Sequence, residues 1–182
     1  DNWDRDLEVL GVADKISIDN LSDEHIETIS RSDFLLIGPI LKEVDLDLIR
    51  GIREFYNGEI FLDPQGLIRT IEDGLIKRVC DRSELKEIIK LVNIVKPNEF
   101  EAEVITGMKT AEEAAKKLVE WGADIGIVTL GENGSIAYDG NELFKIPPYK
   151  TLSRDPTGAG DTYAGAFIFK KLCGSNVREA CE

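Results

Sequence analysis

The sequence contains very little histidine and cysteine, and this shortage excludes several kinds of site. Its 182 residues include one histidine, His25, and three cysteines, Cys80, Cys173 and Cys181. A histidine-rich metal site is excluded and a histidine-based triad is disfavoured, so acid–base chemistry falls to carboxylates. The cysteines lack metal-ligand spacing, and their odd, sparse count fits a reducing compartment, so we expect a cytoplasmic protein.

Positive charge is also scarce, and long apolar runs do not occur. The net charge is −13, which argues against binding to nucleic acid or to anionic membranes, since both require basic patches. No apolar run approaches the about 20 residues of a membrane span, and the acidic first four residues do not resemble a signal peptide. We therefore expect neither a nucleic-acid partner nor a membrane partner.

The residues that are present predict one domain over residues 1–182, built from alternating strands and helices. Such alternation gives a mostly parallel sheet with helices on both faces, a three-layer α/β/α fold. Residues 7–12 and 16–21 fit either two strands or a strand and a helix. We expect strands at 34–37, 59–62, 93–95 and 125–129, helices at 45–56, 83–91, 98–105, 110–121 and 163–172, and an edge hairpin of 135–138 with 143–146.

Turn and capping residues mark the ends of several expected helices. Gly58 and Gly107 stand where helices would end, and Thr110 with Glu113 predicts a capping box. Asp63, Asn98, Thr129 and Asp161 each fall just after an expected strand or at the start of the following helix. Ligands gather at the carboxyl ends of parallel strands, so we expect these four residues to share one site.

The glycine-rich stretch at residues 155–161 predicts an anion site. Gly158 and Gly160 let the backbone approach a ligand, and unpaired amides at the start of the following helix favour a phosphate group. Asp161 lies in the same first turn, where a carboxylate can accept a proton from a hydroxyl group. This combination suits phosphoryl transfer to an alcohol, although a simple glycine-rich turn followed by an acid fits equally well. A Rossmann fingerprint and a P-loop are both excluded.

Two further segments carry candidate ligands. Asn98 and Glu101 share one face of a helix start, and their oxygens suit Mg²⁺ that keeps several waters and is shared with phosphates. Capping alone also explains these two residues. The loop that contains Thr129, Gly131 and Gly134 can approach a purine and a ribose, and it fits a ligand-free hairpin turn equally well.

Taken together, residues 96–101, residues 129–131 with Gly134, and residues 155–161 resemble the ribokinase-like (PfkB) carbohydrate kinases in order and spacing. The resemblance implies ATP and Mg²⁺ as cofactors. It implies Asp161 as the base, an anion hole from the Gly158, Ala159 and Gly160 amides, Asn98 and Glu101 for magnesium and phosphates, and Thr129, Gly131 and Gly134 for the nucleotide.

The resemblance also extends to weaker features. Asp155 and Thr157 occupy the places of a monovalent-cation site, and Pro156 replaces the intervening threonine, which leaves potassium open. Residues 61–69 resemble the myo-inositol kinase branch, where Gln65 and Arg69 would reach the phosphoryl group. Pairing of Arg69 with a surface acid is the alternative.

The resemblance implies a small-molecule acceptor, namely a sugar or a polyol. A nucleoside or phosphosugar kinase of the same fold, or a non-catalytic metabolite-binding relative, are the alternatives. The sequence begins after the region where family members carry the lid and most substrate contacts, and it stops within the helices after Asp161. We therefore expect the chain alone to bind sugar poorly. Family members often pair through the lid, which implies a homodimer for the full-length protein.

Overall fold

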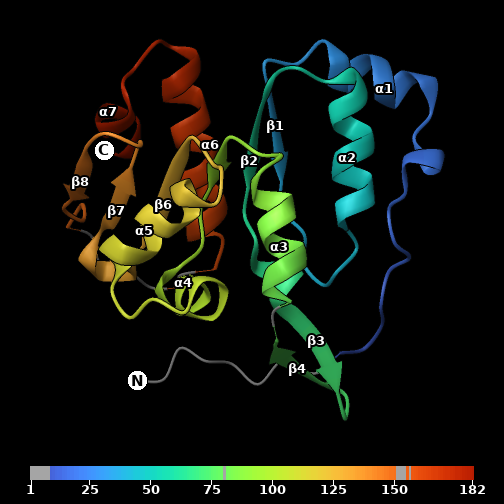
Figure 1. The fold of residues 1–182 in the computed structure, drawn as a ribbon, viewed down its shortest axis with the longest axis horizontal. Helices are drawn as coiled ribbons and strands as arrows, with labels where there is room; N and C mark the ends of the chain where they lie inside the picture. The colour runs from blue at the N-terminus through green and yellow to red at the C-terminus, as the bar shows by residue number, and fades with distance from the viewer. Residues whose placement is uncertain (1–8, 80, 151–154, 156) are drawn as a thin grey trace.

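The computed structural model describes residues 9–79, 81–150, 155 and 157–182. Its centre is a six-stranded sheet in the order β1-β2-β5-β6-β7-β8, in which the first four strands are parallel and the last two are antiparallel (Figure 1). The strands are β1 (Phe34–Ile37), β2 (Glu59–Leu62), β5 (Ile94–Val95), β6 (Ile125–Thr129), β7 (Ser135–Tyr138) and β8 (Leu143–Ile146). The expected parallel sheet and its edge hairpin are therefore confirmed.

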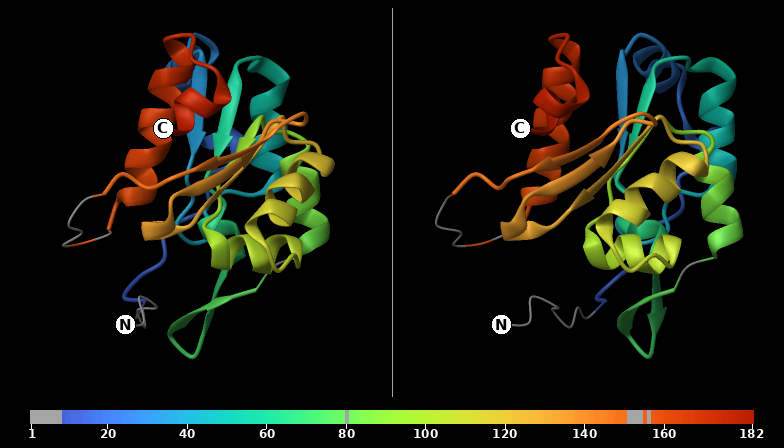
Figure 2. Two further views of the ribbon diagram at one scale, coloured as in Figure 1. Left: turned by 90° about the vertical axis from the view of Figure 1, so that its left-hand side faces the viewer. Right: turned by 60° about the vertical axis from the view of Figure 1, so that its left-hand side comes forward.

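Helices cover both faces of this sheet, as the alternating pattern predicts. Figure 2 shows α2, α3, α4 and α5 on one face and α6 with α7 on the other. The helices are η1 (Ile18–Asn20), α1 (Asp23–Ser30), α2 (Leu46–Phe55), η2 (Gln65–Ile68), α3 (Arg82–Ile89), α4 (Glu99–Thr106), α5 (Ala111–Glu120), η3 (Gly131–Asn133), α6 (Ala159–Leu172) and α7 (Val177–Cys181). The three-layer α/β/α fold is confirmed.

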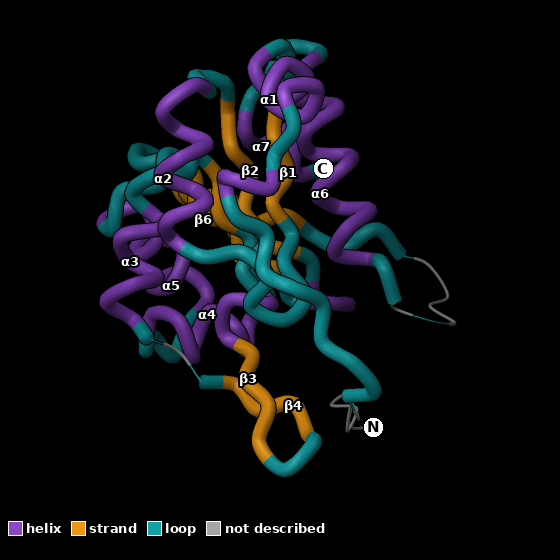
Figure 3. Tube along the Cα trace, turned by 90° about the vertical axis from the view of Figure 1, so that its right-hand side faces the viewer, coloured by secondary structure: helices purple, strands orange, loops and turns teal. Residues whose placement is uncertain are grey.

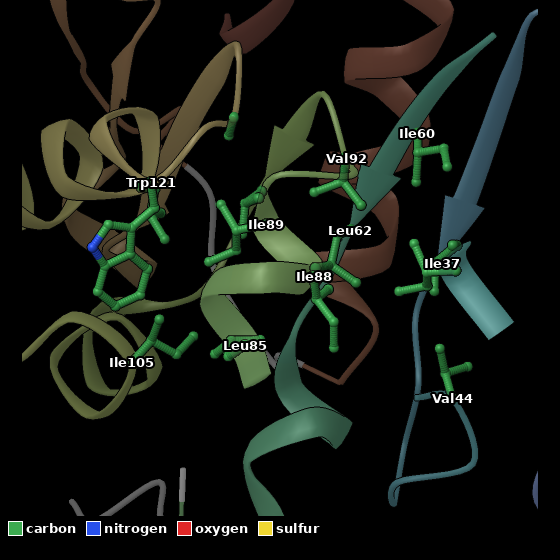
Figure 4. Close-up of a cluster of buried hydrophobic side chains, with 14 of the residues drawn as sticks. Ile37, Val44, Ile60, Leu62, Leu85, Ile88, Ile89, Val92, Ile105 and Trp121 are labelled. Atoms are coloured by element: carbon green, nitrogen blue, oxygen red, sulfur yellow. The ribbon is translucent and has the colours of Figure 1, made fainter. Parts of the chain in front are cut away.

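Strand β2 shows how the alternation of side chains divides the core between the two faces. Ile60 and Leu62 point into the larger cluster under α2 and α3, which Figure 4 shows in detail. Phe61 points to the opposite face and packs on Phe167 of α6, with ring centroids 5.7 Å apart. Because Phe61 and Phe167 are both fully buried, their contact packs α6 against the sheet near the carboxyl end of β2.

The helix ends correct two details of the sequence analysis. Helix α2 has its C-cap at Tyr56, which is extended, so Gly58 does not cap it; the chain turns there directly into β2. Thr110 caps α5 by accepting from the Glu113 amide, but the Glu113 carboxylate accepts from the Thr110 hydroxyl rather than from its backbone. Gly107 caps α4 in the left-handed conformation, as expected.

Two elements lie outside the expected pattern. Helix α1 follows η1 near the amino end; η1 lies within residues 16–21, where the sequence leaves strand and helix open, whereas no element was expected at α1. A separate two-stranded ribbon, β3 (Arg69–Glu72) with β4 (Leu75–Arg78), projects from the body of the molecule (Figure 3). Among the described residues, no helix combines the length and the apolar character that crossing a membrane requires.

Candidate active site

The polar side chains that follow β2, β5 and β6 meet at one edge of the sheet. The last residues of β2 and β5 are paired in the register, so Asp63 and Lys96 leave the sheet side by side. Two residues after Lys96, Asn98 forms an isolated parallel bridge with Thr129. The structure therefore brings together three of the four residues that we expected at the strand ends, with Lys96 among them.

A buried ion pair lies at the centre of this edge. The Lys96 ammonium nitrogen is 2.8 Å from Oδ2 of Asp63, and the two side chains are 3% and 11% exposed. The second oxygen of Asp63, Oδ1, accepts the Gln65 amide at 3.3 Å, which begins the turn after β2. A buried charge is tolerated only when it is paired in this way, so the two residues depend on each other.

Asn98 and Glu101 form a reciprocal cap at the start of α4. Oδ1 of Asn98 accepts the Glu101 amide at 2.9 Å, and Oε2 of Glu101 accepts the Asn98 amide at 3.0 Å. Glu101 is buried, and this burial raises the pKa of its carboxyl group. The negative Asp63 also raises that pKa, whereas the Asn98 amide, Lys96 and Arg69 lower it. The capping interpretation of this pair is therefore correct, and the second Glu101 oxygen, Oε1, makes no hydrogen bond with the described residues.

The first turn of α6 lies against the ion pair. Its N-cap, Gly158, is left-handed with φ of 78°, and a Cβ built there would meet nothing within 4 Å, so the space beside it is open. A Cβ on Gly160 would lie 3.4 Å from the Lys96 ammonium nitrogen and 3.9 Å from Oδ2 of Asp63. Phe61 and Phe167 hold the helix in this place from below.

The side chain of Asp161 is exposed in this first turn. It makes no hydrogen bond or ion pair with the described residues, whereas its neighbour Thr162 donates its hydroxyl to the Gly158 carbonyl at 2.9 Å. Ala159, between the two glycines, is exposed as well. The helix start is thus open to a ligand rather than covered by packed side chains.

The residues just before α6 form a local turn. Oδ1 of Asp155 accepts the Thr157 amide at 2.9 Å, and both residues are exposed. Residue 156, the proline of the predicted monovalent-cation segment, lies outside the described residues. The cation site therefore remains a prediction.

The three residues of the predicted nucleotide loop have different surroundings in the structure. Thr129 ends β6 and donates its amide to the Pro97 carbonyl at 3.1 Å. Gly131 has φ of 56° and open space where a Cβ would stand. Gly134 has φ of 90°, and a Cβ there would lie 2.0 Å from the Ile146 carbonyl oxygen. Packing within the β7–β8 hairpin is thus sufficient to explain the glycine at position 134.

The turn after β2 places Gln65 and Arg69 together. Arg69 donates to Oε1 of Gln65 at 3.0 Å and to the Ile40 carbonyl at 3.2 Å. Between them, Gly66 approaches the backbone of Pro39 so closely that a Cβ would lie 2.4 Å from the Pro39 carbonyl carbon. Arg69 therefore ties the turn after β2 to the loop after β1.

The match to known proteins decides the family. The model of the pfkB family carbohydrate kinases matches residues 67–182, well over half of the chain. The chain belongs to the PfkB family. A cytidine kinase of Thermococcus kodakarensis is 34% identical over 161 residues, which are 87% of this chain and 53% of that protein. The chain thus spans about half the length of this curated relative.

Solved structures of the ribokinase fold agree with this assignment. A ribokinase from Thermotoga maritima superposes with a TM-score of 0.70 at 30% identity, over 88% of this chain and 50% of that one. A pyrophosphate-dependent kinase of the ribokinase family, complexed with a pyrophosphate analog and myo-inositol, gives 0.82 at 24% identity, over 97% and 62%. At that identity the second likeness concerns the fold alone.

Members of the PfkB family transfer phosphoryl groups. The side-chain oxygens at this edge of the sheet supply only some of the ligands that a magnesium ion needs. Capping uses Asn98 Oδ1 and Glu101 Oε2, which leaves Glu101 Oε1 as a hard oxygen ligand. No cluster of three acidic, histidine or cysteine side chains suited to a metal occurs in residues 9–79, 81–150, 155 and 157–182. The site therefore fits an ion that keeps waters and takes other ligands from phosphate oxygens.

Lys96 is the residue that the sequence analysis misses. A single lysine before a proline resembles an ordinary surface residue, and the sequence is rich in acids that can pair with it. The available signal is its position directly after a short buried strand, beside the residue that follows the neighbouring strand. Only the register of β2 and β5 makes this signal visible.

Proposed function

We propose that this chain contains the donor-binding and catalytic part of a kinase that transfers the γ-phosphoryl group of ATP to a hydroxyl of a small sugar, polyol or nucleoside. One observation supports this most directly. The open first turn of α6, which carries Asp161, lies against the Lys96–Asp63 pair beside Glu101. Helix amides and a free carboxylate at one edge are what phosphoryl transfer to an alcohol requires.

In the proposed reaction, Asp161 accepts the proton of the acceptor hydroxyl. The hydroxyl oxygen forms a bond to the γ-phosphorus while the bond to the ADP oxygen breaks, and ADP leaves. The amides of Gly158, Ala159 and Gly160 stabilise the charge that develops on the phosphoryl oxygens. A bound magnesium ion would neutralise the donor phosphates, and Glu101 would hold it through water with Asn98 fixing the orientation of that carboxylate. Thr129 and Gly131 would line the nucleotide site, and the proposed role of Gly134 there is to shape the loop.

Four further assignments remain proposals. Asp155 and Thr157 would bind a potassium ion beside the α6 turn. Gln65 and Arg69 would contact the phosphoryl group or the acceptor, although their mutual hydrogen bond supports a role in shaping the loop equally well. The family relatives support a small-molecule acceptor, and a homodimer of the full-length protein is proposed on the resemblance alone.

The decisive experiment replaces the proposed base in the full-length protein. Asp161→Asn should reduce kcat about 10²- to 10⁴-fold, because a general base contributes that much. Phosphoryl transfer is measured with ATP or pyrophosphate as donor and with ribose, cytidine, myo-inositol or fructose 6-phosphate as acceptor. Asp47→Asn is the matched control, since Asp47 is an exposed acid in the first turn of α2.

The outcomes separate the alternatives. If Asp161→Asn keeps kcat within a fewfold of wild type, Asp161 is not the base. If the wild-type protein binds the donor but transfers no phosphoryl group to any acceptor, the protein is a non-catalytic metabolite-binding relative. The preferred acceptor decides between a sugar, a polyol and a nucleoside.

A further inference from the structure

The buried ammonium group of Lys96 has no role in the reaction described above, yet it occupies the centre of the site. Its side chain is only 3% exposed, and its charged partner is Asp63. Burying such a charge costs several kcal/mol unless the pairing is good, and an apolar pair of similar volume is often as stable. Stability alone therefore does not explain a lysine at this position.

The position of the ammonium group relative to α6 is the second observation. A Cβ on Gly160 would be 3.4 Å from it, at van der Waals contact distance, so the Gly160 backbone lies directly beside the ammonium group. The ion pair thus forms the surface on which the first turn of α6 lies. Moving or removing Lys96 would change where the Gly158, Ala159 and Gly160 amides point.

Charge is the third observation. Asp63, Glu101 and Asp161 place three carboxylates at this edge, and Lys96 is the buried cation among them. A phosphate donor is strongly anionic, so it is repelled by carboxylates that are not balanced. The Lys96 ammonium group lies under the same helix turn whose amides would meet the donor. Its positive charge adds to the positive end of the α6 dipole.

We propose that Lys96 is a positioning residue, which acts through Asp63 and Gly160 to hold the first turn of α6 in the geometry that binds and stabilises the transferred phosphoryl group. This inference rests on the proposed function, since it concerns the same site. It assigns to the ion pair a task beyond folding. Removing the charge should therefore impair the site even when the fold is restored.

The test uses three variants of the full-length protein. Lys96→Met leaves Asp63 buried without a partner and should lower the thermal midpoint. Lys96→Met with Asp63→Asn removes both charges, keeps Oδ1 for the Gln65 amide, and should recover most of the midpoint. Lys96→Arg keeps the charge. The matched control is Lys117→Met, which removes a lysine paired with Glu120 on the outer side of α5.

We expect the double variant to fold yet to lose about 10²-fold in kcat, because small misplacements of catalytic groups cost that much. Its affinity for ATP, measured without acceptor by calorimetry, should fall at least about tenfold, while KM for the acceptor changes less than about threefold. Lys96→Arg should keep kcat at least about tenfold above that of Lys96→Met.

Recovery of both kcat and ATP affinity in the folded double variant would overturn the proposal, because the ion pair would then serve stability alone. Absence of phosphoryl transfer in the wild-type protein would instead refute the proposed function. In that case ATP affinity still decides the role of Lys96, since a tenfold loss supports it and a change below twofold refutes it.

Discussion

Glu101 combines a buried position with a charge that the proposed reaction needs. Its carboxyl group is held by the Asn98 amide, and burial is the main cause of its raised pKa. Asp63 adds to this increase, while Lys96 opposes it. In the absence of a ligand, burial therefore makes the carboxylate form of Glu101 more costly, whereas a bound magnesium ion would stabilise it.

The buried carboxyl group of Glu101 predicts that the free energy of unfolding depends on pH. The pKa of Glu101 in the folded protein is raised above the ordinary value of 4.5, so its contribution to stability is fully present below pH 4.5 and is lost as the pH rises through the raised pKa. Glu101→Gln keeps the capping oxygen and loses the charge. We expect the variant to be more stable than wild type at pH 7 and to bind Mg·ATP about 10- to 100-fold more weakly.

Urea unfolding of the ligand-free protein between pH 4 and pH 8 measures the first effect, and calorimetry measures the second. Glu103→Gln, at a more exposed position on the same helix, is the control. Parallel stability curves for wild type and Glu101→Gln across this range would show that the Glu101 charge carries no cost.

The sequence predicts some residues of the candidate site and not others. Asn98, Glu101 and Asp161 are visible because each opens a helix after a strand, and a local pattern records that position. Lys96 is not visible, because its significance comes from Asp63 on a different strand and from Gly160 more than sixty residues later. Local sequence contains no information on that contact until the strand order is known.

At the scale of elements, the β6–β7 connection separates glycines that the fold needs from glycines that a ligand would need. Gly134 has φ of 90° and ψ of −135°, a region almost restricted to glycine. A Cβ there would also overlap the Ile146 carbonyl. Gly131 lies in the ordinary left-handed region and faces open space.

The same substitution at the two glycines should therefore have different effects. Gly134→Ala should destabilise the protein by about 3 kcal/mol, from backbone strain and steric overlap together. Gly131→Ala should cost about 1 kcal/mol and should weaken ATP binding in the folded protein. Chemical denaturation and calorimetry measure these effects. Equal losses of stability in both variants would contradict this division.

Elements differ in how well the sequence predicts them. The strands β1, β2 and β6 are short, mostly apolar runs with clear ends, and their predicted bounds agree with the structure. The β3–β4 ribbon is missed although Asp73 and Gly74 form a favourable hairpin turn, both with positive φ. Its strands, Arg-Thr-Ile-Glu and Leu-Ile-Lys-Arg, do not alternate regularly between apolar and polar residues, and four positions each are too few for a strand period to stand out.

At the scale of the whole molecule, the uneven covering of the sheet is the main feature. The face under α2 and α3 is closed by the larger core cluster, whereas Leu36 of β1 is 44% exposed on the opposite face. Phe169 and Leu172 of α6 are also exposed. The related cytidine kinase is about twice as long as the part matched by this chain.

These features lead to a prediction about the 182-residue chain by itself. It should bind ATP measurably, because the proposed donor residues lie within it. It should phosphorylate the acceptor at least about 10²-fold more slowly than the full-length protein, because the acceptor would not be held in position. Parallel assays of the two proteins with the preferred acceptor measure the difference, and comparable turnover would contradict it.

The close approach of Gly66 to Pro39 has a consequence for the shape of the site. The Gly66 carbonyl also accepts the Lys42 amide at 3.0 Å, and a Cβ at Gly66 has no room. The loops after β1 and β2 are therefore packed against each other through backbone atoms and form one continuous wall. Since Asp63 begins the second loop, this wall extends from Pro39 to the ion pair beside α6.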